Sequence, residues 1–211
     1  MTTPPSDHLV ITPRVHYVGT PVMLLGTSNP DGSANLAAGS SYWALGQFLV
    51  IGLETDSRTY DNVVARPELT VNFPSPQIWE AVERLADTTG REEVPEAKSH
   101  RYRYEADKFA VAGLTPLESQ VVAPPRVGEC ALQLEAKVRR VTPGMGEYAI
   151  VEAEVVRVHA LPQIVKAGTQ HINPRAWQPL IYSYRHYFGI GTELGFRPTS
   201  DTHGEAANPP A

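Results

Sequence analysis

Short apolar runs separated by turn residues dominate the first quarter of the chain. Residues 21–28 form a continuous run of apolar and small side chains, short enough to be a strand buried on both faces. Residues 29–33 read Asn-Pro-Asp-Gly-Ser, and the Asp-Gly pair readily takes positive φ, so residues 34–40 are predicted to return as the second strand of a hairpin. Residues 47–53 give a third strand. This pattern predicts a meander, the start of a barrel or sandwich.

The next stretch predicts two helices with a strand between them. The first helix begins near Ser57, whose hydroxyl can accept from the free N–H groups of a first turn, and ends near Ala65 because Pro67 disfavours helical geometry just before it. Residues 68–73 alternate and form a fourth strand. Residues 77–85 repeat apolar side chains at helical spacing, which predicts a surface helix with one buried face.

Two long β segments are predicted in the second half, over residues 128–141 and 147–159. In the second segment the apolar positions fall on odd numbers as far as Val155 and then switch to Val156 and Val158. Successive side chains of a strand point to opposite faces, so this change of parity predicts a β-bulge.

A charged segment, residues 87–107, interrupts the apolar pattern and is expected to be the longest loop or insertion, of the kind that lies over sites or at interfaces. Within it, residues 101–104 alternate Arg and Tyr, a pattern compatible with stacking on bases and with a strand that has one solvated face; we favour the strand. A short helix is expected from Lys108 to near Gly113.

The length of 211 residues and the 42% apolar content fit one globular domain. We expect residues 1–196 to form it, with residues 1–13 as an N-terminal arm and residues 197–211 as a disordered tail. Nineteen prolines and sixteen glycines, together with the short apolar runs, favour an all-β fold with peripheral helices.

Charge and cysteine content exclude several functions. A net charge of −5 argues against binding to nucleic acid, which requires a basic face. The single cysteine, Cys130, excludes an internal disulfide; it shares the parity of Leu132 and Leu134 and is expected to be a buried structural thiol. Seven histidines lack metal-ligand spacing, so no metal is expected. Neither a signal peptide nor a membrane-spanning run is seen, which predicts a cytoplasmic protein without membrane contact.

Residues 57–59 and 35–41 are the best candidates for a ligand site. Ser57, Arg58 and Thr59 combine a helix start with hydroxyls and a cation, which favours a bound anion, although Asp56 opposes it unless it turns outward. A plain capped helix with a surface arginine is the alternative. In the other stretch, Asn35 and the Ser40-Ser41 pair flank small residues over which a flat ring could lie, or they simply form a barrel corner.

Motifs spread over residues 15–196 form an ordered series without large gaps. They are Thr20-Pro21-Val22, Asp31-Gly32, Asn35-Leu36-Ala37 with Ser40-Ser41, Ser57-Arg58-Thr59-Tyr60-Asp61-Asn62, Val71-Asn72, Asp107-Lys108-Phe109 with Gly113-Leu114-Thr115, Pro125-Arg126-Val127-Gly128-Glu129, His171-Ile172-Asn173, Trp177-Gln178-Pro179-Leu180-Ile181-Tyr182, and Arg185-His186-Tyr187-Phe188. This series resembles the flavin reductase-like FMN-binding split-barrel proteins, the group that includes flavoredoxins.

The resemblance implies a six-stranded antiparallel split barrel of Greek-key type and a homodimer with two FMN sites at the subunit interface. It also implies electron transfer from NAD(P)H to the flavin, with FMN as the cofactor and FAD as the alternative. Reduced flavin would then pass to a partner monooxygenase or another acceptor. A second hypothesis is a flavoprotein of the same fold that acts as an electron carrier or a small-molecule oxidase without NAD(P)H turnover, and a third is a flavin-binding protein without turnover.

The same resemblance extends the set of site residues. With the FMN phosphate against residues 57–59, it adds Asn62 and Asn72 to the cofactor-binding residues, although Asn72 is equally suited to capping a turn. It also adds Lys108, as a cation near the flavin or, alternatively, as a surface partner of Asp107.

Three residues near the C-terminus complete the set that the resemblance implies. His171 is the catalytic candidate, as a hydrogen-bond or proton donor near the nicotinamide. Arg185 and Tyr187 belong to a segment that the family places near the site entrance. One position departs from the family: several flavin reductases carry a histidine in a Gly-x-His segment where this chain has Tyr148, so that histidine's role does not transfer.

Overall fold

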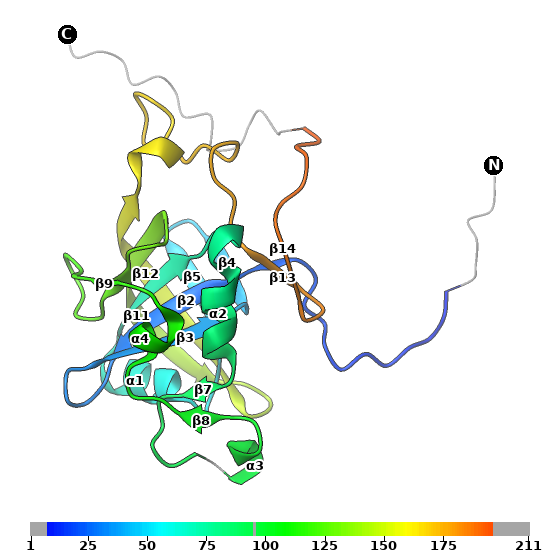
Figure 1. Cartoon of the computed structure of the whole chain (residues 1–211), viewed down its shortest axis with the longest axis vertical. Helices are drawn as coiled ribbons and strands as arrows, with labels where there is room; N and C mark the ends of the chain where they lie inside the picture. The colour runs from blue at the N-terminus through cyan, green and yellow to red at the C-terminus, as the bar shows by residue number, and fades with distance from the viewer. Residues whose placement is uncertain (1–7, 95, 196–211) are drawn as a thin grey trace.

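The computed structural model describes residues 8–94 and 96–195, and the predicted tail, residues 197–211, lies outside them. A curled antiparallel sheet, seven-stranded within these residues, forms its centre (Figure 1). In spatial order its strands are β3 (Ala34–Gly39), β2 (Met23–Ser28), β6 (Glu68–Phe73), β11 (Leu132–Pro143), β12 (Tyr148–Ala160), β5 (Phe48–Glu54) and β4 (Tyr42–Leu45). The predicted all-β class with peripheral helices is therefore confirmed.

The sheet curls because its first and last strands are joined by only two residues. Ser40 and Ser41 connect β3 at one edge to β4 at the other, and the backbone N–H of Gly52 donates to Ser41 O at 3.0 Å. Two residues span at most about 7 Å of extended chain, so the edges must meet at this end. Residues 42–45 thus form a strand beyond the predicted one at residues 34–40, and the sheet has seven strands within the described residues.

Several predicted elements are confirmed almost to the residue. The Asp31-Gly32 hairpin joins β2 to β3, with Gly32 at φ 86°. Helix α1 (Arg58–Ala65) is capped by Ser57, and α2 (Trp79–Ala86) buries Val82 and Leu85.

The bulge predicted from the parity switch is also present. Glu135 of β11 pairs with Arg157, and the next residue, Ala136, pairs with Val155, which leaves Val156 as the extra residue.

Smaller elements surround the barrel. The strands are β1 (Thr20–Pro21), β13 (Ile181–Ser183) and β14 (His186–Phe188) in one sheet, β9 (Pro116–Leu117) with β10 (Arg126–Val127), and β7 (Thr88–Thr89) with β8 (Arg103–Tyr104). The remaining helices are α3 (Glu96–Ser99), α4 (Lys108–Ala112) and the 3-10 turns Pro76–Ile78 and Pro162–Ile164. The charged segment 87–107 therefore contains a parallel two-residue strand pair and a short helix.

Two apolar cores lie on opposite faces of the sheet. Met23 and Leu25 of β2 point into the barrel interior, whereas Val22 and Leu24 face a second core under α2 and α4. This arrangement confirms that the strand is buried on both sides. Cys130 is buried, as predicted, but in the second core, because β11 begins only at residue 132 and Leu134 packs in the first core.

Two polar residues of β11, Gln133 and Glu135, are buried, which the alternating pattern did not indicate. Glu135 has no exposed surface, and its carboxylate accepts hydrogen bonds from the backbone N–H groups of Gln120, Val121 and Val122 at 2.6–3.0 Å. His159 Nε2 lies 2.6 Å from Glu135 Oε1. Burial by itself raises the carboxyl pKa, but these hydrogen bonds lower it to about 2. The carboxylate thus fixes the loop over this face of the barrel.

We predict that Glu135→Gln lowers the free energy of unfolding by about 3 kcal/mol at neutral pH, because an amide cannot accept all of these donors. The pKa of Glu135 is depressed on folding, so its contribution is present above about pH 4.5 and is lost as the pH falls towards about 2. Urea unfolding at a series of pH values measures both effects. The exposed Glu118, on the same loop, provides the control Glu118→Gln. Equal stability of the two variants would contradict the role of Glu135.

Candidate functional site

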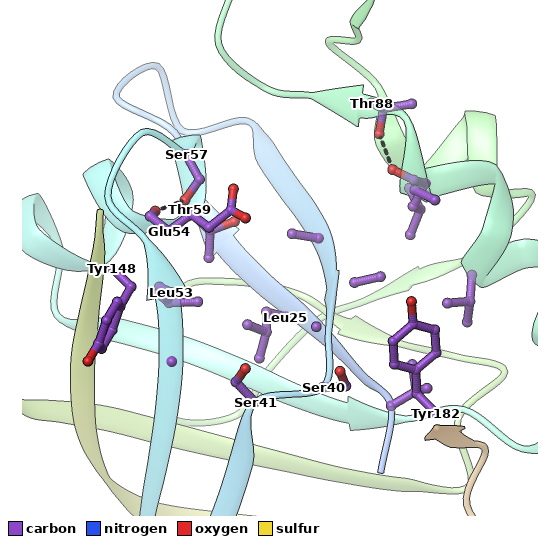
Figure 2. A pocket seen from close by; sticks show the side chains of 18 of the residues that line it. Leu25, Ser40, Ser41, Leu53, Glu54, Ser57, Thr59, Thr88, Tyr148 and Tyr182 are labelled. Carbon is purple, nitrogen blue, oxygen red and sulfur yellow. Dashed lines mark hydrogen bonds between the residues drawn. The ribbon is translucent and has the colours of Figure 1, made fainter. Parts of the chain in front are cut away.

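A cavity of about 710 Å³ opens where the end of β3, the N-terminus of α1 and helix α2 meet. Figure 2 shows Ser57, Thr59 and Glu54 at one end, Tyr182 at the other, and Ser40 and Ser41 between them. The lining residues are Tyr17, Val22, Leu25, Ala37, Ala38, Gly39, Ser40, Ser41, Gly52, Leu53, Glu54, Asp56, Ser57, Thr59, Val82, Leu85, Ala86, Thr88, Tyr102, Lys108, Glu147, Tyr148, Tyr182 and Tyr187.

Small side chains form the part of the wall that belongs to β3. Ala37, Ala38 and Gly39 line the cavity, and Ser40 and Ser41 continue the wall towards β4. Gly52 of β5 leaves space at this corner, because a Cβ atom there would lie 3.0 Å from Ser41 Cβ, a tight contact. The small residues of this stretch therefore leave the backbone accessible from the cavity.

The N-terminus of α1 points its free N–H groups at one end of the cavity. Ser57 caps the helix: its hydroxyl accepts from the N–H of Tyr60 at 3.2 Å and donates to Glu54 O at 2.7 Å. Thr59 is buried and lines the same end. The unpaired N–H groups of the first turn and the helix dipole favour an anion here. Asp56 also lines the cavity.

A narrow branch of about 80 Å³ continues past this helix end, and Arg58 lines it. Arg58 Nε donates to Gly90 O at 3.0 Å. A Cβ atom on Gly90 would lie 2.5 Å from Asn35 Oδ1 and 3.0 Å from Arg58 Cγ, so only glycine allows this approach. The branch is closed by Gly90 together with Thr89 and Val94.

An ion pair holds the 87–107 segment over α1. Both Arg91 Nε and Nη2 donate to the Asp61 carboxylate, at 2.9 and 2.7 Å, and Nη2 also donates to Thr55 O at 3.2 Å. Thr88 and Tyr102 line the cavity, so part of the segment that we expected to lie over a site or an interface belongs to the cavity wall.

Lys108 is buried, with only 5% of its surface exposed, and lines both the cavity and its branch. Its ammonium donates to Thr88 O at 3.3 Å. Burial lowers its pKa from 10.5 to about 8, with Glu105 opposing the shift. The alternative of a surface Lys-Asp pair is wrong, because the ammonium is buried and Asp107 caps α4 by accepting from the N–H of Ala110.

Aromatic rings form the opposite end of the cavity. Tyr182 lies between Tyr17 and Tyr187, with ring centroids 5.9 and 5.4 Å away. The hydroxyl of Tyr187 donates to Glu83 at 2.9 Å, and burial with this acceptor raises its pKa. Tyr187 thus lines the cavity as predicted, whereas Tyr17, Tyr182 and Thr88 were not predicted. The aromatic content of residues 182–188 is the sequence feature that could have predicted Tyr182. No feature of the sequence indicated Thr88.

Three predicted asparagines are not among the residues that line the cavity. Asn35 donates to Thr27 and Thr59 hydroxyls at 3.0 and 3.1 Å, and its Oδ1 has no partner within the described part of the chain. Asn62 donates to Thr27 and Asn29. Asn72 donates to Leu24 O at 2.9 Å and accepts from the N–H of Val127. Their amides join strands and helix behind the site.

Two further predicted residues are separated from the cavity. His171 lies in the segment that follows β12, where its carbonyl accepts from the N–H of Lys166. Arg185 is exposed in the turn between β13 and β14, at φ 69°. Neither lines the cavity of its own chain. Tyr148, at the position of the family histidine, does line it.

Within residues 8–94 and 96–195, no helix is long and apolar enough to cross a membrane. The same residues contain no group of three or more His, Cys, Asp or Glu side chains that could hold a metal ion.

These features define a β-barrel protein with a cavity lined by small side chains, a helix N-terminus and a buried lysine. The chain belongs to the family of the flavin reductase like domain, whose model matches residues 15–191. It is 40% identical over 195 residues to the uncharacterized protein YdfE of Bacillus subtilis (strain 168), a match that covers 91% of this chain and 94% of that protein. The family inferred from the motif series is therefore confirmed.

Solved structures share the fold at low sequence identity. The flavoredoxin of Desulfovibrio vulgaris (Miyazaki F) matches with a TM-score of 0.76 and 21% identity, over 92% of this chain and 98% of that one. Nitrilotriacetate monooxygenase component B from Bacillus cereus matches with a TM-score of 0.73 and 18% identity, over 91% and 100%. The split-barrel class is thereby confirmed, and family membership supports a flavin cofactor and oxidoreductase chemistry.

We predict that the buried ammonium of Lys108 makes stability depend on pH. Its pKa is lowered on folding, so the unfolded chain binds more protons between about pH 8 and pH 10.5, and the free energy of unfolding rises with pH across this window. Lys108→Met should raise stability at neutral pH by up to about 3 kcal/mol and flatten the rise. Urea unfolding of the ligand-free protein measures this, with Lys166→Met, outside the cavity lining, as the control. An unchanged pH profile in Lys108→Met would contradict the prediction.

Proposed function

We propose that this protein is an NAD(P)H-dependent flavin reductase that holds FMN in the cavity and passes reduced flavin to a monooxygenase or another acceptor. The observation that carries the proposal is the meeting of three features in one cavity: the α1 N-terminus, the small-residue end of β3, and the buried Lys108. Family membership supports the flavin, and the component B relative supports a monooxygenase as acceptor.

The dimensions of the site favour FMN over FAD. A volume of about 710 Å³ is typical of cavities for ligands of this size, which run from about 300 to 1,000 Å³. The phosphate would be held by the N–H groups at Ser57 and Thr59 and by Arg58 at the entrance to the narrow branch. That branch, at about 80 Å³, accommodates a phosphate and is too small for an adenosine.

The side chains of the cavity would position and shield the reacting ring. A bound flavin supplies the hydride-accepting chemistry. Lys108 offers a buried ammonium to an anionic ring edge, and the serines at 40 and 41 offer hydroxyls to its polar groups. The Tyr182 and Tyr187 rings exclude water from one end.

We further propose a cytoplasmic homodimer. His171 and Arg185 lie outside the cavity of their own chain. In a homodimer, these two predicted residues would instead reach the cavity of the second copy.

A second candidate is a flavoprotein of this fold that transfers electrons without oxidising NAD(P)H. The observation that favours it is Tyr148, a cavity-lining residue at the position where several flavin reductases carry a histidine. An imidazole is the side chain suited to exchanging a proton near neutral pH, and this chain has none at that position.

We predict that Arg58→Ala weakens FMN binding by about 1.5–3 kcal/mol, the scale of a hydrogen bond to a charged group. Titration of FMN, followed by quenching of its fluorescence, measures the affinity. The control is Arg66→Ala, at the other end of the same helix, where the guanidinium likewise donates to a backbone carbonyl, that of Pro30. Equal FMN affinity of wild type and Arg58→Ala would reject the phosphate site.

The reaction itself is tested by steady-state oxidation of NADH and NADPH by the FMN-loaded protein. We expect oxidation of at least one nucleotide well above the rate with free FMN, and a further increase in Tyr148→His. A protein that binds FMN and oxidises neither nucleotide would support the second candidate instead. A colourless protein that does not take up FMN would reject both.

A further inference from the structure

Residues 8–18, called the N-terminal arm from here on, expose several large apolar side chains, although Tyr17 near their end packs against Tyr182. Leu9 is 86% exposed, Val10 99% and Ile11 71%, and Val18 near its end is 69% exposed. Residues 8–18 belong to no helix or strand, and Figure 1 shows the segment leading away from the barrel. β-Branched and aliphatic residues of this kind favour extended, half-buried strands. Such a segment gains from an apolar cover that its own chain does not supply among the described residues.

The hairpin of β4 and β5 presents a second uncovered apolar surface. Trp43 is 55% exposed, Leu45 74% and Phe48 51%. These three side chains share the outer face, because Leu45 pairs with Phe48 and Trp43 pairs with Val50, two residues further along β5. β4 is also the last strand in the order of the central sheet, and no strand of residues 8–94 or 96–195 pairs with its outer edge.

The two surfaces share the same apolar chemistry. Seven large apolar side chains are involved, and aromatic ones cover about 150–250 Å² each when buried. Together they would bury several hundred Å² of surface per copy, a large part of the roughly 800 Å² per partner that a stable interface buries. An extended apolar segment and an open sheet edge pair by strand addition. Because both occur on the same chain, a two-fold arrangement uses each of them twice.

We propose that the N-terminal arm of one copy lies along the β4–β5 hairpin of a second copy, in a reciprocal exchange. This inference rests on the homodimer proposed above and specifies which surfaces hold it together. The arm enters the three-stranded sheet of its own chain at β1, and β1 pairs with β13 beside the cavity. Exchange of the arm thereby couples assembly to the aromatic wall of the site.

The full-length chain tests this by sedimentation equilibrium over a wide range of concentration. We expect wild type to have the mass of two 23.1-kDa chains. The double change Val10→Lys with Ile11→Lys, and separately Trp43→Lys, should each raise the dimer dissociation constant at least tenfold, about 1.4 kcal/mol. The control Val64→Lys places the same charge at another exposed valine, 55% exposed on α1, and should leave the mass unchanged.

Each remaining outcome overturns the inference. A monomeric wild type excludes the exchange, and a dimer that resists the arm substitutions shows that the arm is not part of the contact. Loss of stability without loss of mass in the arm variant would mean that the arm packs on its own chain. NAD(P)H oxidation and FMN binding of the same samples are measured alongside, so an intact reductase with an unaffected dimer rejects the exchange and leaves the proposed function standing.

Discussion

The two-residue link between the edge strands is the constraint on which the rest of the structure depends. Because Ser40 and Ser41 must join β3 to β4 across the full width of the sheet, the sheet has to curl until its edges meet at that end. Curling brings the end of β3 beside β5, and the chain leaves β5 directly into the Ser57 cap of α1. One short connection therefore creates both the small-residue wall and the helix end that face the same cavity.

Segments distant in sequence close this cavity through a few polar contacts. Arg91 ties the 87–107 segment to Asp61 with a bidentate pair, and Tyr187 fixes the C-terminal sheet to Glu83 of α2. The insertion approaches the helix so closely that position 90 has to be glycine. The enclosure has an electrostatic consequence, because Lys108 loses its hydration and its pKa falls. An anionic group of a ligand beside it would stabilise the charged ammonium that burial destabilises.

Glu135 is a second charged side chain that is buried by a segment folded over the barrel, and here the consequence concerns stability. It lies on β11 at a position whose neighbours alternate in polarity, yet it is completely buried and receives three backbone N–H groups of a loop. A buried carboxylate is tolerated only when such donors surround it. Both buried charges therefore depend on loops that fold over the barrel, and the alternation of a strand carries no information about what covers its outer face.

The sequence by itself determined the local elements: the Asp31-Gly32 hairpin, the Ser57 cap and the extra residue at Val156 all depend on side chains within a few positions of one another. The motif series also determined the family. Only the tertiary structure decided which predicted site residues face the cavity, because that depends on contacts between distant segments. It brought Lys108 into the wall, withdrew Asn62 and Asn72 into supporting networks, and left His171 outside, since a periodic pattern specifies a face of an element and not its neighbour.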